Sequence, residues 1–250
     1  MISTARQKEL FEQIHDQYYE GSTDQYALAY KETFVRKWIL SHLNGSHSLI
    51  ELASGIGSTA SWLRQQTDGL EISGCDISER AAEDFRSLHN RPCYVADLTK
   101  PFDIGHKFDT VVITGGIHHL IADLNTAFEN IRKLLNNGGR LIMTEPNADF
   151  MLQAARKLWY EIDKSNFDAA NEEALSHDAL FREHGNGFSL VGLKYYGGPA
   201  YFLLCLNWIL RVPSSSKRWL APPLMHIERL YSALPGRWPF ASFMACWEKQ

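Results

Sequence analysis

Short apolar runs alternate with longer segments of helical spacing between residues 48 and 147, and this alternation constrains the fold more than any other feature of the chain. Strands that alternate with helices are typical of a parallel sheet covered on both faces, so we expect an open, doubly wound α/β fold. The predicted strands span 48–54, 71–77, 92–98, 108–115 and 140–146, and the predicted helices between them span 58–66, 79–89 and 122–135. Asn-Gly-Gly at 137–139 is expected to end the last of these helices.

The pattern is interrupted after residue 146 and then resumes. We expect, in order, an amphipathic stretch, an acidic connector, a helix and two strands, over 150–164, 166–173, 177–184, 188–196 and 240–248. An apolar insertion rich in Trp, Leu and Pro, residues 197–238, separates the last two strands. The sheet is therefore expected to have seven strands, to be mostly parallel, and to carry an apolar helical insertion before its last strand.

The chain is long enough for one full core and a cap, since it has 250 residues of which 45% are apolar. Residues 5–43 predict two helices ahead of the sheet, which would form a lid. We expect an N-terminal helical cap over 1–44 and a ligand-binding domain over 45–250, with cap insertions at about 148–175 and 197–238.

The composition argues against several classes of protein. A net charge of −4 and a pI near 6.2 give no electrostatic footprint for nucleic acid. The four cysteines are far apart, so we expect reduced, mostly buried thiols in a cytoplasmic protein. The N-terminus lacks the apolar core of a secretory signal, and the longest apolar run, 199–210, is too short to span a bilayer. At most a weak peripheral contact with a membrane is expected, and the sequence does not indicate an oligomeric state.

Two glycines, Gly55 and Gly57, directly follow the first predicted strand in ELASGIGSTA. Ligands of open parallel sheets bind at the carboxyl ends of the strands, and glycine there lets the backbone turn with positive φ and lets a ligand approach closely. Ser58 and Thr59 are expected to cap the following helix, whose N-terminus favours a negative group. Taken alone, two glycines after a strand are also typical of an ordinary turn.

Acidic residues in or at the end of three predicted strands indicate which kind of ligand binds there. Glu51 lies inside the first strand, Asp76 ends the second and Asp97 ends the third. A carboxylate at a strand end is costly to bury without partners, so it usually meets a ligand or amides. Dinucleotide enzymes share the feature at Asp76, but they require neither Glu51 nor the third acid.

With these residues the sequence resembles the Rossmann-like (class I) S-adenosylmethionine-dependent methyltransferases of small-molecule type, well over roughly 45–147 and loosely over the last two strands. The resemblance implies S-adenosylmethionine as cofactor and S-adenosylhomocysteine as product. It places Glu51, Ala53, Gly55 and Gly57 at the methionine end, Asp76 on the ribose hydroxyls, Ile77 on the adenine face, Ala96, Asp97 and Leu98 at the adenine edge, and Thr114 and Gly115 beside the methionyl amine and the transferring methyl group.

The N-terminal FEQIHDQYYE resembles, more weakly, the entry helix of many small-molecule members, with Tyr18 or Tyr19 facing the cofactor. An aromatic face beside a sulfonium is physically sensible, because ring quadrupoles attract cations.

The candidate catalytic residues are His118, His119 and Tyr19. The histidine pair is open to three interpretations: structural packing, contact with the substrate or proton transfer, and metal binding. Adjacent side chains point in different directions, so we expect no metal site. Glu145, at the end of the fifth strand, faces the same rim and is either structural or directed to the substrate.

The expected reaction is methyl transfer to an O, N or C nucleophile of a small acceptor that is hydrophobic or carrier-linked. One alternative is an enzyme that uses the same cofactor without methylation, by cyclising it to methylthioadenosine or by catalysing a pericyclic step. Another is a non-catalytic relative, against which the intact set of Glu51, Gly55, Gly57, Asp76 and Asp97 argues. The apolar insertion forms the core of a cap, a pocket for an apolar or lipid-linked acceptor, or a surface that docks on a membrane or partner.

Overall fold

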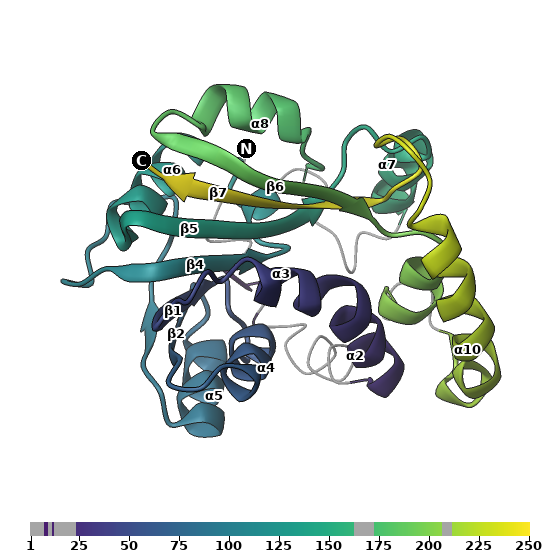
Figure 1. Cartoon of the computed structure of the whole chain (residues 1–250), viewed down its shortest axis with the longest axis horizontal. Helices are drawn as coiled ribbons and strands as arrows, with labels where there is room; N and C mark the ends of the chain where they lie inside the picture. The colour runs from purple at the N-terminus through teal and green to yellow at the C-terminus, as the bar shows by residue number, and fades with distance from the viewer. Residues whose placement is uncertain (1–7, 10–11, 13–23, 163–172, 207–211) are drawn as a thin grey trace.

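The computed structural model describes residues 8–9, 12, 24–162, 173–206 and 212–250. Seven strands form one sheet in the order β3-β2-β1-β4-β5-β7-β6, with helices on both of its faces (Figure 1). The strands are β1 Ser48–Leu52, β2 Glu71–Asp76, β3 Cys93–Val95, β4 Phe108–Thr114, β5 Leu135–Pro146, β6 Phe188–Tyr196 and β7 Ser242–Lys249.

Helices connect and cover the strands. They are α2 Gln25–Lys31, the π-helical turn η1 Glu32–Arg36, α3 Lys37–Ser41, α4 Ser58–Gln66, α5 Glu79–His89, the 3₁₀ turn η2 Ile117–His119, α6 Leu124–Leu134, α7 Gln153–Ile162, α8 His177–His184, the π-helical turn η3 Tyr201–Cys205 and α10 Ser214–Tyr231. None of the helices in these described ranges is long and apolar enough to cross a membrane.

All neighbouring strands are parallel except β7, which runs antiparallel to β5 and to β6. The predicted doubly wound, mostly parallel fold is therefore confirmed. The chain winds outward from β1 in one direction through β2 to β3, and in the other direction through β4. Ligands of such sheets bind where the strand order reverses, at the carboxyl ends, so the candidate site is expected beyond the ends of β1 and β4.

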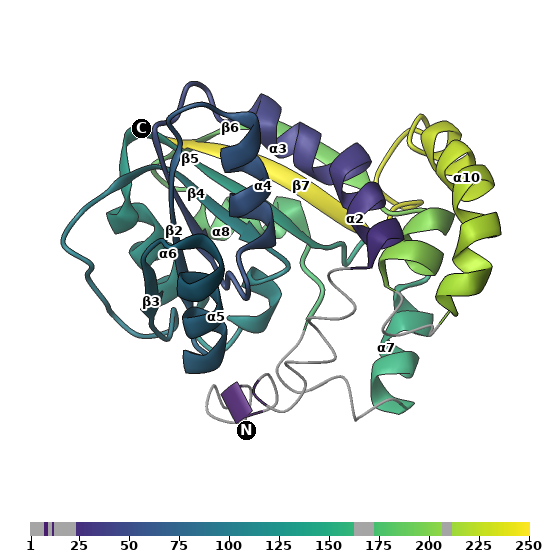
Figure 2. The same ribbon diagram turned by 90° about the horizontal axis from the view of Figure 1, so that it is seen from below.

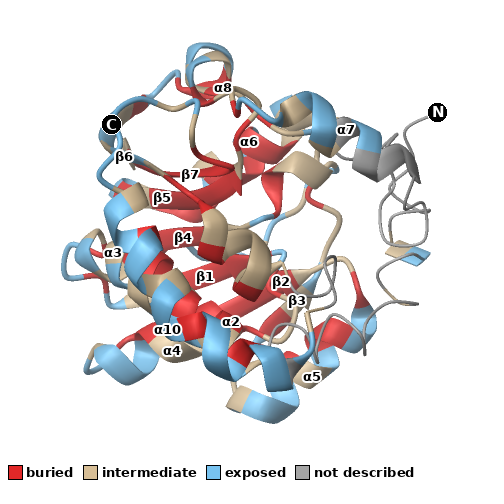
Figure 3. Ribbon diagram, turned by 90° about the vertical axis from the view of Figure 1, so that its right-hand side faces the viewer, coloured by how far each residue is buried: buried red, intermediate tan, exposed pale blue. Residues whose placement is uncertain are grey.

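The sheet is buried on both faces, as parallel sheets usually are (Figure 3). Successive residues of β1 point to opposite faces. Leu49 packs in a core cluster with residues of the run from α2 to α3 and of α4, whereas Ile50 packs in a second cluster with residues of α6 and α8. This alternation places the side chain of Glu51 on the same face as Leu49.

The sequence prediction is wrong at the junction of α6 and β5. The helix ends at Leu134, and the strand begins at once at Leu135, so Asn-Gly-Gly lies inside β5. The register between β4 and β5 is irregular there, and Asn136 donates its side-chain amide to Asp109 at 2.9 Å. The tertiary pairing with β4 therefore overrides a local pattern that is typical of a helix end.

The N-terminal helices form a continuous run from Gln25 to Ser41 against the sheet, with a π-helical turn in its middle. α2 contacts both η3 and α10, and Figure 2 shows α2, α7 and α10 at one end of the molecule. The first helix that we predicted within 5–43 lies largely outside the described residues.

Buried polar contacts join α2 to the apolar insertion. Lys217 is fully buried and pairs with Asp24, the N-cap of α2, at 3.0 Å. Tyr30 donates its hydroxyl to Glu228 at 2.8 Å, and Glu228 also accepts from the backbone N–H of Gly198 and of Ala200. Because each charge has a partner, burial of this network does not leave an isolated ion.

Candidate functional site

The loop between β1 and α4 has three residues in the left-handed region. Their φ values are +48° at Ala53, +51° at Gly55 and +71° at Gly57. A Cβ atom on Gly55 would meet no heavy atom within 4 Å, whereas one on Gly57 would lie 2.2 Å from Cε2 of Phe85. Gly55 therefore leaves its backbone open to a ligand, and Gly57 lets α5 pack closely against the loop.

We expect Gly57→Ala to destabilise the protein by about 2–5 kcal/mol, because positive φ and overlap with Phe85 both oppose a methyl group. Urea denaturation measures this loss. Gly55→Ala is the matched control, since it has a similar φ but open space, and it should cost only about 1 kcal/mol. Equal losses in the two variants would contradict the close packing on Phe85.

The start of α4 differs from the prediction. The N-cap position is Gly57, which has no side chain, and neither Ser58 nor Thr59 occupies it. Glu51 reaches up from β1 instead, and its Oε2 accepts the backbone N–H of Ala60 at 2.9 Å. A carboxylate below the first turn interacts favourably with the positive end of the helix dipole.

Asp76 joins the glycine loop to the end of β2. Its two carboxylate oxygens accept the backbone N–H of Gly55 at 2.8 Å and that of Ser78 at 2.9 Å. The side chain is half-buried, as is Ile77 beside it. Each oxygen of a carboxylate can accept more than one hydrogen bond, so the chemistry of this side chain suits a diol.

The third strand end lies next to the second. The backbone N–H of Ala96 donates to the carbonyl of Asp76 at 3.0 Å. Asp97 accepts from Thr99 and pairs with Lys100 at 3.0 Å; although burial raises its pKa, these contacts hold the pKa below its usual value. Leu98 is buried, and Asn130 fixes its carbonyl at 3.0 Å.

Arg36 was not singled out from the sequence. It lies on η1, which packs against α4, the helix that follows the glycine loop. It is only 5% exposed, and Nε and Nη2 of its guanidinium have no hydrogen-bond partner among the described residues. Its Cζ lies 5.9 Å from the ring centroid of Trp62 on α4. Arg36 and Glu51 also influence each other electrostatically.

Glu51 is almost completely buried, and this burial raises its pKa to about 7, although the Ala60 N–H and the charge of Arg36 act in the opposite direction. The folded chain therefore holds a proton that the unfolded chain, with an ordinary pKa near 4.5, loses between that value and pH 7. The contribution of Glu51 to stability accordingly falls as pH rises through this window.

From this sign we expect Glu51→Gln to be more stable than the wild type at pH 8, by about 1–3 kcal/mol, and equally stable near pH 4, below the unfolded pKa. Gln keeps an acceptor for Ala60 but never ionises. Urea denaturation at both pH values provides the measurement. A Glu51→Gln variant that is less stable than the wild type at pH 8 would show that the anion stabilises the ligand-free fold.

The fourth strand end carries a buried acid under the histidine pair. Glu145 of β5 accepts the backbone N–H groups of Gly116, Ile117 and His118 at 2.8–3.2 Å. Nδ1 of His118 lies 2.7 Å from Oε2 of the same carboxylate. The turn itself is fixed to β5, because Gly115 donates its N–H to the Thr144 carbonyl at 2.7 Å.

Burial lowers the pKa of His118 and raises that of Glu145. The imidazole is therefore neutral at pH 7, and we assign its proton to Nδ1, which then donates to Glu145 and leaves Nε2 as an acceptor. The ring of His119 lies against that of His118 at a centroid distance of 3.8 Å, with the two planes tilted by 40°, and burial lowers the pKa of His119 as well. A histidine oriented by a carboxylate is the usual arrangement of a general base, and the lowered pKa makes His118 a weaker base in the ligand-free protein than a free imidazole.

The structure thus brings together, at the carboxyl ends of neighbouring strands, most of the residues singled out from the sequence. They are Glu51, Ala53, Gly55 and Gly57 around the end of β1, Asp76 and Ile77 after β2, Ala96, Asp97 and Leu98 after β3, and Thr114, Gly115, His118 and His119 after β4. Tyr18 and Tyr19 lie outside the described residues. Glu12 is described, and it accepts the hydroxyl of Ser78 at 2.8 Å beside Asp76 and Ile77.

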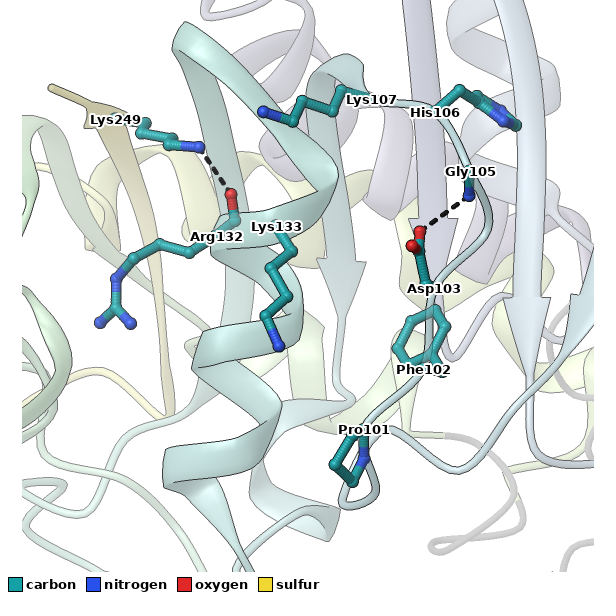
Figure 4. Close-up of a pocket in the computed structure, with 9 residues that line it drawn as sticks. All are labelled: Pro101, Phe102, Asp103, Gly105, His106, Lys107, Arg132, Lys133 and Lys249. Atoms are coloured by element: carbon teal, nitrogen blue, oxygen red, sulfur yellow. Dashed lines mark hydrogen bonds between the residues drawn. The ribbon is translucent and has the colours of Figure 1, made fainter.

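A cavity of about 860 Å³ lies elsewhere, where the chain enters β4 and where α6 and β7 end (Figure 4). Two of its basic side chains donate to backbone carbonyl groups. Lys249 donates to the carbonyls of Arg132 and Leu135 at 2.7 and 2.8 Å, and Arg132 donates to those of His184 and Asn186. The cavity lies where β4 and β5 begin, so it is separate from the site at the carboxyl ends of the strands.

No cluster of three or more His, Cys, Asp and Glu side chains suited to a metal ion occurs in the ranges that the structure describes. The fold and the residues at the strand ends define a Rossmann-like domain with an open glycine backbone, an acid at the end of β2 and a buried acid within β1.

Comparisons with known proteins show what part of the chain is similar to. Residues 50–141 match the model of a methyltransferase domain. A demethylmenaquinone methyltransferase of Thermus thermophilus is 34% identical over 104 residues, which are 39% of this chain and 46% of the relative. The reducing polyketide synthase Preu2 of Preussia isomera is 27% identical over 106 residues, 39% of this chain and 4% of the relative. The chain thus spans less than half the length of these curated relatives.

Solved structures share the fold. A SAM-dependent methyltransferase of Thermotoga maritima has a TM-score of 0.62 at 17% identity and covers 97% of this chain and 99% of its own. The N-methyltransferase NodS of Bradyrhizobium japonicum, solved with S-adenosylhomocysteine, has a TM-score of 0.53 at 12% identity, with coverage of 86% and 85%. The fold is that of Rossmann-like methyltransferases, and residues 50–141 match a methyltransferase domain, which supports the predicted resemblance to the S-adenosylmethionine-dependent family.

The residues present fit the cofactor of this family. Gly55 has open space where a Cβ would stand, and Asp76 presents a half-buried carboxylate directly beside it. Glu51 offers a buried acid for an ammonium group. These features suit a ribose diol and an amino acid end on either side of the glycine loop.

Proposed function

We propose that this chain transfers the methyl group of S-adenosylmethionine to a small acceptor that is hydrophobic or carrier-linked. The observation that carries the proposal is the meeting of three features at the carboxyl ends of neighbouring strands. These are the open backbone at Gly55, the carboxylate of Asp76, and the His118–Glu145 pair after β4.

The chain's own residues bind and orient the reactants. Asp76 accepts the ribose hydroxyls, Ile77 packs on the adenine ring, and Asp97 accepts from the adenine amino group beside the Leu98 amide. Thr114 and Gly115 border the methionine end. When bound, S-adenosylmethionine supplies an electrophilic methyl group, and the electron pair of its broken C–S bond remains on sulfur.

His118 serves as the base in this proposal. Its Nε2 takes the proton of a weakly acidic acceptor, while Glu145 holds the ring in the required tautomer and orientation. His119 packs on the ring and positions it. Much of the remaining acceleration comes from holding the reactants in line and away from water.

An aromatic group beside the ends of β6 and β7 favours an apolar acceptor. Tyr201 packs against Tyr30, Tyr196 and Phe202 at ring-centroid distances of 5.7–5.8 Å, and Ser242 donates its hydroxyl to Tyr201 at 3.3 Å. One of the relatives is named for a menaquinone precursor and the other for polyketide synthesis. These names support an acceptor that has a ring or is attached to a carrier.

We further propose that residues 1–44 and the insertions at about 148–175 and 197–238 form the cap over this acceptor, above a ligand-binding domain that spans 45–250. The support is the buried network that links α2 to α10 through Lys217, Tyr30 and Glu228. All four cysteines are free, which favours action in the reducing cytoplasm.

Product analysis tests the proposal. Purified protein is incubated with methyl-labelled S-adenosylmethionine and a metabolite extract, and the products are separated by mass spectrometry. The proposal predicts S-adenosylhomocysteine together with one labelled acceptor. Methylthioadenosine would indicate cyclisation of the cofactor, and an unchanged cofactor that binds without turnover would indicate a non-catalytic relative; either result would contradict methyl transfer.

A further inference from the structure

Arg36 is a buried cation whose bonding capacity the described chain does not use. It is 5% exposed, and both Nε and Nη2 lack a hydrogen-bond partner in the part of the chain that the structure describes. Leaving charged donors unpaired in the interior is costly, because they have lost water and gained no acceptor. Such a side chain is retained at lower cost where a ligand supplies the acceptor.

The position of Arg36 is also specific. It ends the π-helical turn η1, and such turns are frequent at functional sites. From there its guanidinium lies near Trp62, on the helix that follows the glycine loop, and its charge acts on Glu51, below the first turn of that helix. Arg36 is thus placed at the methionine end of the site and not at its ribose end.

The methionine end of the cofactor is best bound by one acidic and one basic group of the protein. The amino acid portion of S-adenosylmethionine carries an ammonium and a carboxylate. Glu51 is a buried acid and Arg36 a buried cation, so the two together present charges complementary to this zwitterion. A planar guanidinium with two unused donors also matches a carboxylate, which accepts two parallel N–H bonds.

We infer that Arg36 binds the methionyl carboxylate of the cofactor, while Glu51 faces the ammonium. The inference rests on the proposed function and adds a residue that the motifs do not contain. Binding of the carboxylate satisfies Nε and Nη2, and it places the cofactor's amino acid end between η1 and the glycine loop.

Three ligands separate the contribution of Arg36 from that of the adenosyl group. S-Adenosylhomocysteine carries both charged groups, S-adenosyl-3-thiopropylamine lacks only the carboxylate, and methylthioadenosine lacks both. Isothermal titration calorimetry of the wild type should show the first binding about 10- to 100-fold more tightly than the second.

In Arg36→Met this preference should disappear. The affinity for S-adenosylhomocysteine should fall about 10- to 100-fold, and the affinities for the other two ligands should stay within about twofold. Arg36→Lys keeps the positive charge but lacks the two parallel N–H donors of a guanidinium. It should retain part of the preference. Lys37→Met, an exposed neighbour on α3, is the matched control and should bind all three ligands as the wild type does.

Two outcomes would overturn the inference. One is a wild type that binds S-adenosyl-3-thiopropylamine as tightly as S-adenosylhomocysteine. The other is an Arg36→Met variant that loses affinity for all three ligands equally, which would mark a structural role. If Arg36→Met fails to fold by circular dichroism, the wild-type comparison and Arg36→Lys still decide. Failure of the proposed function is distinct, since it appears in the product analysis as methylthioadenosine or as no turnover, whereas the titrations measure binding alone.

Discussion

Alanine at position 76 is expected to weaken the binding of S-adenosylhomocysteine by at least about 100-fold, because two hydrogen bonds from the ribose to a carboxylate are lost. Asp76→Asn keeps one acceptor oxygen and should lose about 10-fold. Isothermal titration calorimetry measures both variants. The affinity for methylthioadenosine, which keeps the ribose, should fall by a similar factor. Arg36→Met, in contrast, is expected to lose affinity only for S-adenosylhomocysteine.

The change at Asp76 also disturbs the loop, since its carboxylate holds the N–H groups of Gly55 and Ser78. Thermal unfolding of the ligand-free variant therefore accompanies the titration. Asp103→Ala is the matched control, because Asp103 likewise accepts a backbone N–H, that of Gly105, but lies by the separate cavity of Figure 4. An affinity that stays unchanged in Asp76→Ala would refute the assignment of the ribose site.

His118→Ala is expected to lower the turnover number by about 10²- to 10⁴-fold when the acceptor is weakly acidic, because the proton then has no positioned acceptor. The affinity for S-adenosylhomocysteine should stay nearly constant. Glu145→Gln should cause a smaller loss, since Gln can still accept from the turn but no longer favours the reactive tautomer as strongly. The rate of S-adenosylhomocysteine formation with the acceptor-containing extract provides the measurement.

A matched control for this prediction is His106→Ala, an exposed histidine in the loop before β4. It should turn over at the wild-type rate. Full activity in His118→Ala would remove this residue from the mechanism and leave positioning alone as the role of the pair. Loss of cofactor binding in the same variant would instead indicate that the turn after β4 had collapsed.

The central strands could be predicted closely because parallel strands buried on both faces consist of nearly continuous apolar runs. The first predicted strand, 48–54, and the observed β1, Ser48–Leu52, share their start, and β6 matches throughout. The start of β5 could not be found in this way, since Asn-Gly-Gly has the local pattern of a helix end. Pairing with β4, a contact remote in sequence, decides it.

The same distinction applies to the site. Glu51, Gly55, Asp76 and Asp97 could be singled out because they stand at strand ends in a recurring spacing. Arg36 lies within a helical run, where a basic residue usually indicates a solvated face. Only the packing of η1 against α4 shows that its side chain is buried. Likewise, the role of Glu145 as the partner of His118 depends on the alignment of β4 with β5.

The most direct measurement is a crystal structure of the protein with S-adenosylhomocysteine. We predict that the ligand lies across the carboxyl ends of β1, β2 and β4, with both ribose hydroxyls on Asp76 and the sulfur toward His118. A ligand bound elsewhere, or one whose ribose leaves Asp76 without contact, would contradict it.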